Sequence, residues 1–161
     1  MARSMHDDAA DEGYSGKQAC EIVGISYRQL DYWDRQGVVS PSLKAAHGSG
    51  SQRRYSYRDL VRLRLVKRIL DSGVQLKNAR KAIEYLREEE GSDWQTASIV
   101  LAEGTSIVAR DQDALIDLVR RGQGVLNIVP VGAVAGEVDD RIVRLADETS
   151  AEGGARAAEG G

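Results

Sequence analysis

The sequence predicts a mainly α-helical N-terminal domain followed by a small C-terminal α+β domain, and three observations support this fold class. Its 161 residues are enough for one ordinary domain or two small ones. Apolar residues repeat with helical spacing up to about residue 90, whereas short alternating runs begin at about residue 98. The turn-rich stretch Gly91, Ser92 and Asp93 separates the two patterns, so we place the domain boundary there.

The charge of the chain divides at the same place. Residues 13–90 carry 15 Lys and Arg against 9 Asp and Glu, a net charge of +6, whereas residues 91–161 carry 6 against 12, a net charge of -6. A basic half joined to an acidic half indicates that the basic half binds nucleic acid or an anionic surface. The whole-chain net charge of -3 hides this division.

Composition also excludes several classes of protein. No apolar run is long enough to span a membrane, and the acidic N-terminal stretch lacks the apolar core of a secretory signal. The single cysteine, Cys20, permits no internal disulfide and no multi-cysteine metal site. We therefore expect a cytoplasmic protein without a membrane partner, a metal or a cofactor.

Both ends of the chain are rich in Ala, Gly, Asp and Glu and show no apolar period. Such segments cannot bury enough apolar surface to offset the entropy of ordering. We expect residues 1–13 and 147–161 to be disordered tails. The folded domains would then cover residues 14–91 and 92–146.

The N-terminal domain begins with two predicted short helices. Ser15 and Gln18, and again Ser26 and Gln29, have the spacing of a capping box at a helix start. Glycine ends the first helix at residue 24 and the second at residue 37. This pattern predicts a helix-turn-helix, although helical hairpins that bind no nucleic acid share it.

The next segment predicts a hairpin with a long basic tip. Val38, Val39 and Pro41 are typical of a short edge strand, and residues 52–55 form a second strand. The intervening loop contains Lys44 and two glycines, Gly48 and Gly50. This hairpin would be a wing that lies against the DNA backbone, with Arg53 and Arg54 as phosphate ligands; the alternative is an ordinary solvated loop.

Two more helices complete this domain. Ser56 and Asp59 cap a third helix with a broad apolar face, and Ser72 and Gly73 end it. A fourth helix, from about residue 75 to residue 89, repeats apolar residues at spacings of three and four. The result is a winged helix-turn-helix domain with four helices.

The C-terminal half predicts three strands and two helices. Residues 98–102 and 105–109 are typical of a β-hairpin, and residues 125–131 of a third strand. Residues 111–122 and 134–146 have amphipathic helical patterns. A core of about fifty residues is thin, so burying part of it against a second copy would stabilise it. We therefore assign dimerisation, and any binding of an effector, to residues 92–146.

Three motifs occur in order along the N-terminal half: LDYWDRQGVV at residues 30–39, RRYSYRDL at residues 53–60 and ILDSGVQLK at residues 69–77. Together they resemble the N-terminal winged-helix domain of the MerR family of bacterial transcription regulators. The longer run from Gly13 to Tyr55 is similar to a branch of that family linked to the control of cell-division genes.

The resemblance implies a homodimer on double-stranded, pseudo-palindromic promoter DNA. In many members the dimer distorts an overlong promoter spacer so that RNA polymerase can use it. This chain departs from the family where many members have Arg in the second helix and it has Asp31, which repels phosphate and could accept from a cytosine amino group. It also lacks cysteines beyond Cys20 for metal sensing and lacks the long heptad helix that usually forms the dimer.

The predicted recognition helix has a polar stripe. Arg28, Tyr32 and Arg35 are spaced by four and three, opposite Leu30 and Trp33. We expect this stripe to face the major groove, with a merely solvated face as the alternative. The complete predicted set of DNA-binding residues is Ser26, Tyr27, Arg28, Tyr32, Arg35, Lys44, Arg53, Arg54, Tyr55 and Arg58.

Other functional classes have less support. The chain has two histidines and no paired carboxylates in an apolar setting, so we expect no enzymatic activity. An architectural DNA-bending or protein-binding winged-helix protein is the alternative function, because it would share the N-terminal half. The sequence does not identify an operator, a mode of regulation or an effector.

Overall fold

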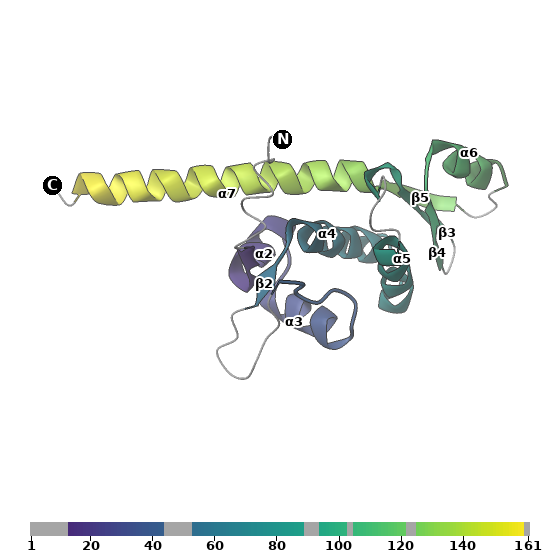
Figure 1. The fold of residues 1–161 in the computed structure, drawn as a ribbon, viewed down its shortest axis with the longest axis horizontal. Helices are drawn as coiled ribbons and strands as arrows, with labels where there is room; N and C mark the ends of the chain where they lie inside the picture. The colour runs from purple at the N-terminus through teal and green to yellow at the C-terminus, as the bar shows by residue number, and fades with distance from the viewer. Residues whose placement is uncertain (1–12, 44–52, 89–93, 103–104, 122–124, 160–161) are drawn as a thin grey trace.

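The computed structural model describes residues 13–43, 53–88, 94–102, 105–121 and 125–159 (Figure 1). The described helices are α2 (Gly16–Val23), α3 (Tyr27–Arg35), α4 (Tyr57–Asp71), α5 (Leu76–Glu88), η1 (Trp94–Thr96), α6 (Gln112–Arg121) and α7 (Val131–Glu159). The described strands are β1 (Tyr14–Ser15), β2 (Arg54–Tyr55), β3 (Ser98–Ala102), β4 (Thr105–Ala109) and β5 (Val125–Pro130). None of the helices in these ranges combines the length and apolar character that crossing a membrane requires.

Three serines start the helices of the N-terminal half as the sequence predicts. Ser15, Ser26 and Ser56 each accept a hydrogen bond from the backbone N–H three residues later, and the residue there bonds back. These capping boxes satisfy backbone amides that a helix start leaves without partners. The predicted starts of α2, α3 and α4 are therefore confirmed.

The predicted strand at residues 38–41 is wrong. Val38 and Val39 are buried, but they lie in an irregular segment, and β2 pairs with β1 instead, in the register Tyr14 with Tyr55. Pro41 has no N–H to donate to a strand ladder. Asp59 also binds this segment, because its Oδ2 accepts from the backbone N (2.9 Å) and Oγ (2.6 Å) of Ser42.

The three strands expected in the C-terminal half form one antiparallel sheet, with the order β4-β3-β5. The register pairs Val100 of β3 with Ile107 of β4 and with Ile128 of β5. The central strand β3 is buried over four of its five residues, which explains its nearly continuous apolar sequence. Helix α6 contacts β4.

Helix α7 corrects the predicted C-terminal tail. It spans 29 residues and includes residues 147–159, which we expected to be disordered. Ala and Glu, which are frequent in this stretch, are strong helix formers, and a helix that is already docked continues without a new nucleation cost. The predicted tail at residues 1–12 lies outside the described residues.

Helix α7 packs along α4 and α2, so the C-terminal helix returns to the N-terminal half (Figure 1). Val131, Val134 and Val138 are buried on its inner face, and they belong to the same apolar cluster as the cores of α2 and α4. On this helix Glu137 accepts from Nε of Arg64 (3.0 Å). Asp139 accepts from the hydroxyl of Tyr57 (2.7 Å).

Candidate nucleic-acid interface

Helix α3 presents a polar face to solvent because its opposite face is fixed in the core. Leu30 is fully buried and Trp33 is 3% exposed. On the outer face Tyr27 is 54% exposed and Tyr32 is 51% exposed, and Arg28 is also exposed. The structure thus brings together the aromatic and basic side chains that the sequence assigned to the DNA-reading face.

Asp31 lies at the edge of this face between two arginines. Its Oδ1 accepts from Nη2 of Arg53 (2.6 Å), and its Oδ2 is paired with Nη2 of Arg35 (2.7 Å). The hydrogen bond from Arg53 is the main cause that lowers the pKa of Asp31; desolvation opposes it, and the charges of Arg35 and Arg53 lower the pKa further. Both carboxylate oxygens already contact arginines of the protein, so Asp31 would offer a cytosine amino group only the lone pairs that Arg53 and Arg35 leave.

Arg53 is not on the surface where the prediction placed it. Its side chain is 10% exposed, and its Nε lies 3.6 Å from Oδ2 of Asp34. Its guanidinium also lies over the ring of Tyr27, 5.8 Å from the centroid. The expectation of a phosphate ligand at Arg53 is therefore corrected: the side chain points back onto α3 because two carboxylates attract it there.

Tyr55 is also not on the surface, where the prediction placed it. Its side chain is fully buried, and burial raises the pKa of its hydroxyl well above the usual range. A buried ring in the core cannot contact DNA directly, so Tyr55 is a core residue. Strand alternation explains both corrections, since residues 53 and 55 lie on the same face of an extended segment.

The remaining predicted residues lie in different settings. Ser26 is exposed, but its hydroxyl caps α3 by accepting from the N–H of Gln29 (3.1 Å). Arg54 is half-buried and lies opposite Ser15 in the β1–β2 pair. Arg58 is half-buried, with its guanidinium 5.4 Å from the ring centroid of Trp94. Lys44 lies outside the described residues.

The prediction omitted a second basic face on α5. Lys77, Arg80 and Lys81 are exposed at helical spacings of three and four, a repeat that could have been recognised in the sequence. A Cβ atom added at Gly37, just after α3, would lie 3.8 Å from Nη2 of Arg80. This basic face therefore adjoins the C-terminal end of α3.

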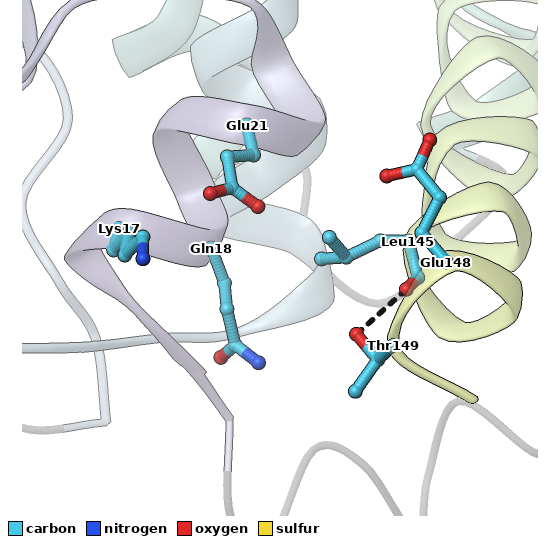
Figure 2. A pocket seen from close by; sticks show the side chains of 6 residues that line it. All are labelled: Lys17, Gln18, Glu21, Leu145, Glu148 and Thr149. Carbon is cyan, nitrogen blue, oxygen red and sulfur yellow. Dashed lines mark hydrogen bonds between the residues drawn. The ribbon is translucent and has the colours of Figure 1, made fainter. Parts of the chain in front are cut away.

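A groove of about 370 Å³ lies on another part of the molecule, between α2 and α7 (Figure 2). Lys17, Gln18 and Glu21 line it from α2, opposite Leu145, Glu148 and Thr149 of α7. The hydroxyl of Thr149 donates to the carbonyl oxygen of Leu145 within its own helix (2.9 Å). The lining mixes carboxylates with an amine and indicates no class of ligand.

Two other observations bear on small ligands. The cavity beside Trp94, lined also by Arg58 and Leu86, has a volume of about 20 Å³, which is room for about one water molecule. Within the part of the chain that the structure describes, no three His, Cys, Asp or Glu side chains are grouped so as to hold a metal ion.

Comparison with known proteins places this surface in context. The MerR HTH family of regulatory proteins matches residues 14–86. An HTH-type transcriptional regulator of Mycobacterium tuberculosis is 46% identical over 132 residues, which cover 80% of this chain and 58% of that protein. The protein named heat shock protein HspR of Streptomyces coelicolor is 31% identical over 61% of this chain and 64% of its own length. The HTH-type transcriptional regulator HmrR of Sinorhizobium medicae is 23% identical over 64% of this chain and 67% of its own length. The chain thus spans less than two thirds of the mycobacterial relative.

Proposed function

This chain belongs to the MerR family through residues 14–86, and we propose that it is a transcriptional regulator that binds promoter DNA sequence-specifically as a homodimer. The observation that carries the proposal is the outer face of α3, where Arg28 and Tyr32 are exposed and the opposite face is fixed by Leu30. A helix held rigidly with polar side chains outward has the form that major-groove reading requires.

In the proposed complex α3 enters the major groove and a neighbouring surface holds the DNA backbone. Arg28 and Arg35 contact base edges or adjacent phosphates, and Tyr27 and Tyr32 lie beside them. Arg54 in β2, and Lys44 in the preceding loop, bind phosphates on one side of the helix. Phosphate contacts fix the register of a protein on DNA, whereas base contacts give the sequence preference.

The charge distribution supports an orientation with the acidic half away from DNA. Figure 1 shows α3 and α7 on opposite sides of α2 and α4. The polar stripe of α3 and the acidic C-terminal half thus lie on different sides of the molecule, which avoids repulsion between phosphates and carboxylates.

The homodimer supplies two copies of α3 for two half-sites. We assign the dimer contact to residues 92–146, which include the thin sheet unit with Ile107, Ile116 and Val119 exposed. Two-fold symmetry then predicts a pseudo-palindromic site with half-sites about one helical turn, or a multiple of it, apart. At a promoter the dimer would form a complex with RNA polymerase and would control transcription by distorting the promoter spacer. This would take place on the nucleoid in the cytoplasm.

Footprinting tests this function. The purified chain is incubated with the DNA upstream of its own gene and of cell-division genes, at several salt concentrations. We expect protection of two half-sites, with affinity that falls steeply as salt rises because counterions are released from the phosphates. An affinity that is independent of salt, or uniform coverage without a preferred site, would refute the proposal; the second outcome would favour an architectural DNA-bending protein.

A further inference from the structure

We propose that Arg53 and Asp31 are positioning residues for DNA reading: without touching DNA, they fix the start of β2 and the exposed Arg35 of α3 relative to each other. This inference rests on the proposed function. We call the cluster of Tyr27, Asp31, Asp34, Arg35 and Arg53 the α3–β2 lock. It joins the recognition helix to the residue immediately before β2.

The lock is held by charge-assisted contacts in a shielded setting. Arg53 is 10% exposed and reaches Asp31 at 2.6 Å and Asp34 at 3.6 Å. The side chains of Asp31 and Asp34 are 22% and 21% exposed. Charged hydrogen bonds in such settings are shorter and stronger than neutral ones. Moving Arg53 outward to a phosphate would break both contacts and leave the two carboxylates close together.

Two nitrogens of Arg53 show that the side chain is not freely adjustable. Its Nε and Nη1 are buried and make no hydrogen bond with the residues that the structure describes. A buried donor without an acceptor is costly, and it persists only where the surrounding structure holds it. The position of Arg53 is therefore set by the fold around it and by Asp31, with only a small part of the guanidinium open to solvent.

One carboxylate connects the two parts of the reading surface. Oδ1 of Asp31 holds Arg53, and Oδ2 holds Arg35, whose side chain is 75% exposed. The direction of Arg35 at the surface and the placement of Arg53 at the start of β2 thus depend on the same group. The lock also balances two positive charges with two negative charges, so it adds little to the nonspecific attraction between α3 and phosphates.

The neighbouring residue Arg54 provides a matched comparison. Arg53 and Arg54 are adjacent and chemically identical, but Arg54 lies on the opposite face of the strand. The variants Arg53→Gln and Arg54→Gln therefore remove the same charge from positions to which we assign different roles. Binding is measured for each on the footprinted operator and on an unrelated duplex, over a range of salt concentrations, with folding checked by circular dichroism.

We expect Arg54→Gln to weaken binding to all DNA and Arg53→Gln to weaken the preference for the operator. Arg54→Gln should weaken binding to both duplexes and reduce the slope of log K against log salt by about 1, because a phosphate contact is lost. Arg53→Gln should leave the slope unchanged on the unrelated duplex and lower the ratio of operator to unrelated affinity by about tenfold, because β2 and Arg35 no longer hold their places relative to each other.

Asp31→Asn is the second variant, because it keeps the shape of the side chain and changes only its charge. We expect it also to lower the affinity ratio, and to raise affinity for the unrelated duplex by releasing Arg35. In the double variant, which combines Asp31→Asn with Arg53→Gln, the affinity ratio should fall little further than in either single variant, as expected for residues that act as a pair.

Three outcomes would overturn the inference. A reduced salt slope for Arg53→Gln equal to that of Arg54→Gln would make Arg53 a phosphate ligand. An unchanged affinity ratio in folded Arg53→Gln and Asp31→Asn proteins would make the lock merely structural. If the unmodified chain prefers no duplex, the proposed function itself fails, and the inference fails with it.

Discussion

Adjacent arginines in this chain have different surroundings, and the difference follows from the geometry of an extended segment. Arg53 shares a face with the buried Tyr55, whereas Arg54 lies on the other face. The alternation of side chains along the extended segment could be predicted from the sequence, but the carboxylates that pair with Arg53 could not. Asp31 and Asp34 come from a helix twenty residues earlier, and only the tertiary fold brings them into reach.

Arg28 is the residue whose replacement tests the reading face most directly. It is exposed on α3, and no described ion pair holds it. Arg28→Ala should reduce operator affinity by about 1 to 3 kcal/mol and relax the preference at one base position. Competition binding against operator variants measures both effects. Lys17→Ala, which removes an exposed cation of α2 in the groove beside α7, is the control and should bind as the unmodified chain does.

The lowered pKa of Asp31 predicts a pH dependence of stability. An unfolded aspartate has a pKa of about 3.9, and the folded value is lower, mainly because of the hydrogen bond from Arg53. The stabilisation is therefore fully present above the unfolded value and is lost as the pH falls through the folded one. Asp31→Asn should lower Tm at neutral pH, and the difference from the unmodified chain should shrink between about pH 5 and pH 2. A difference that stays constant over this range would contradict the assignment, and Asp113→Asn is the exposed control.

At the level of elements, helix starts were the most predictable features. A capping box involves residues only three apart, so Ser15, Ser26 and Ser56 carry their signal locally. The strands of the second half were predictable for a similar reason, since alternation and a two-residue turn are local. The irregular segment at residues 38–43 was not predictable, because it is held by distant residues: Ser42 donates to Asp59, seventeen residues later, and the N–H of Leu43 donates to the carbonyl of Arg54.

Asp59 should therefore contribute more to stability than an ordinary cap. It is fully buried, its Oδ2 accepts from Ser42 and Ser56, and its Oδ1 accepts from Arg62. Asp59→Ala should cost about 3 kcal/mol of unfolding free energy, because it leaves a half-buried arginine without this partner. Ser26→Ala, which removes only a cap, should cost about 1 kcal/mol. Urea denaturation measures both, and equal losses would show that Asp59 acts only as a cap.

For the whole molecule, the division by charge that the sequence shows is not a division of the core. Val131, Val134 and Val138 of the acidic half belong to the same apolar cluster as Leu60 and Val66 of the basic half. The amphipathic pattern of α7 predicted an apolar face but could not show what that face packs against. Net charge depends on the exposed side chains of each half, whereas the apolar cluster depends on which faces of the helices and strands pack against each other.

This continuity predicts that the two halves unfold together. Val138 is fully buried against the N-terminal half, and Val143 on the same helix is 59% exposed. Val138→Ala should cost about 2 kcal/mol by leaving a cavity, whereas Val143→Ala should change stability by less than about 0.5 kcal/mol.

Amide hydrogen exchange distinguishes joint unfolding from separate unfolding. If the halves form one cooperative unit, Val138→Ala should reduce the protection of amides in α4 and in β3 by the same factor, about thirtyfold for a loss of 2 kcal/mol. Loss of protection confined to β3 would instead mean that the sheet and α7 open while the DNA-binding half stays folded. Equal loss of protection in α4 and β3 would mean that the stability of α7 is coupled to that of α3 through α2, because α7 packs against α2 and α2 packs against α3.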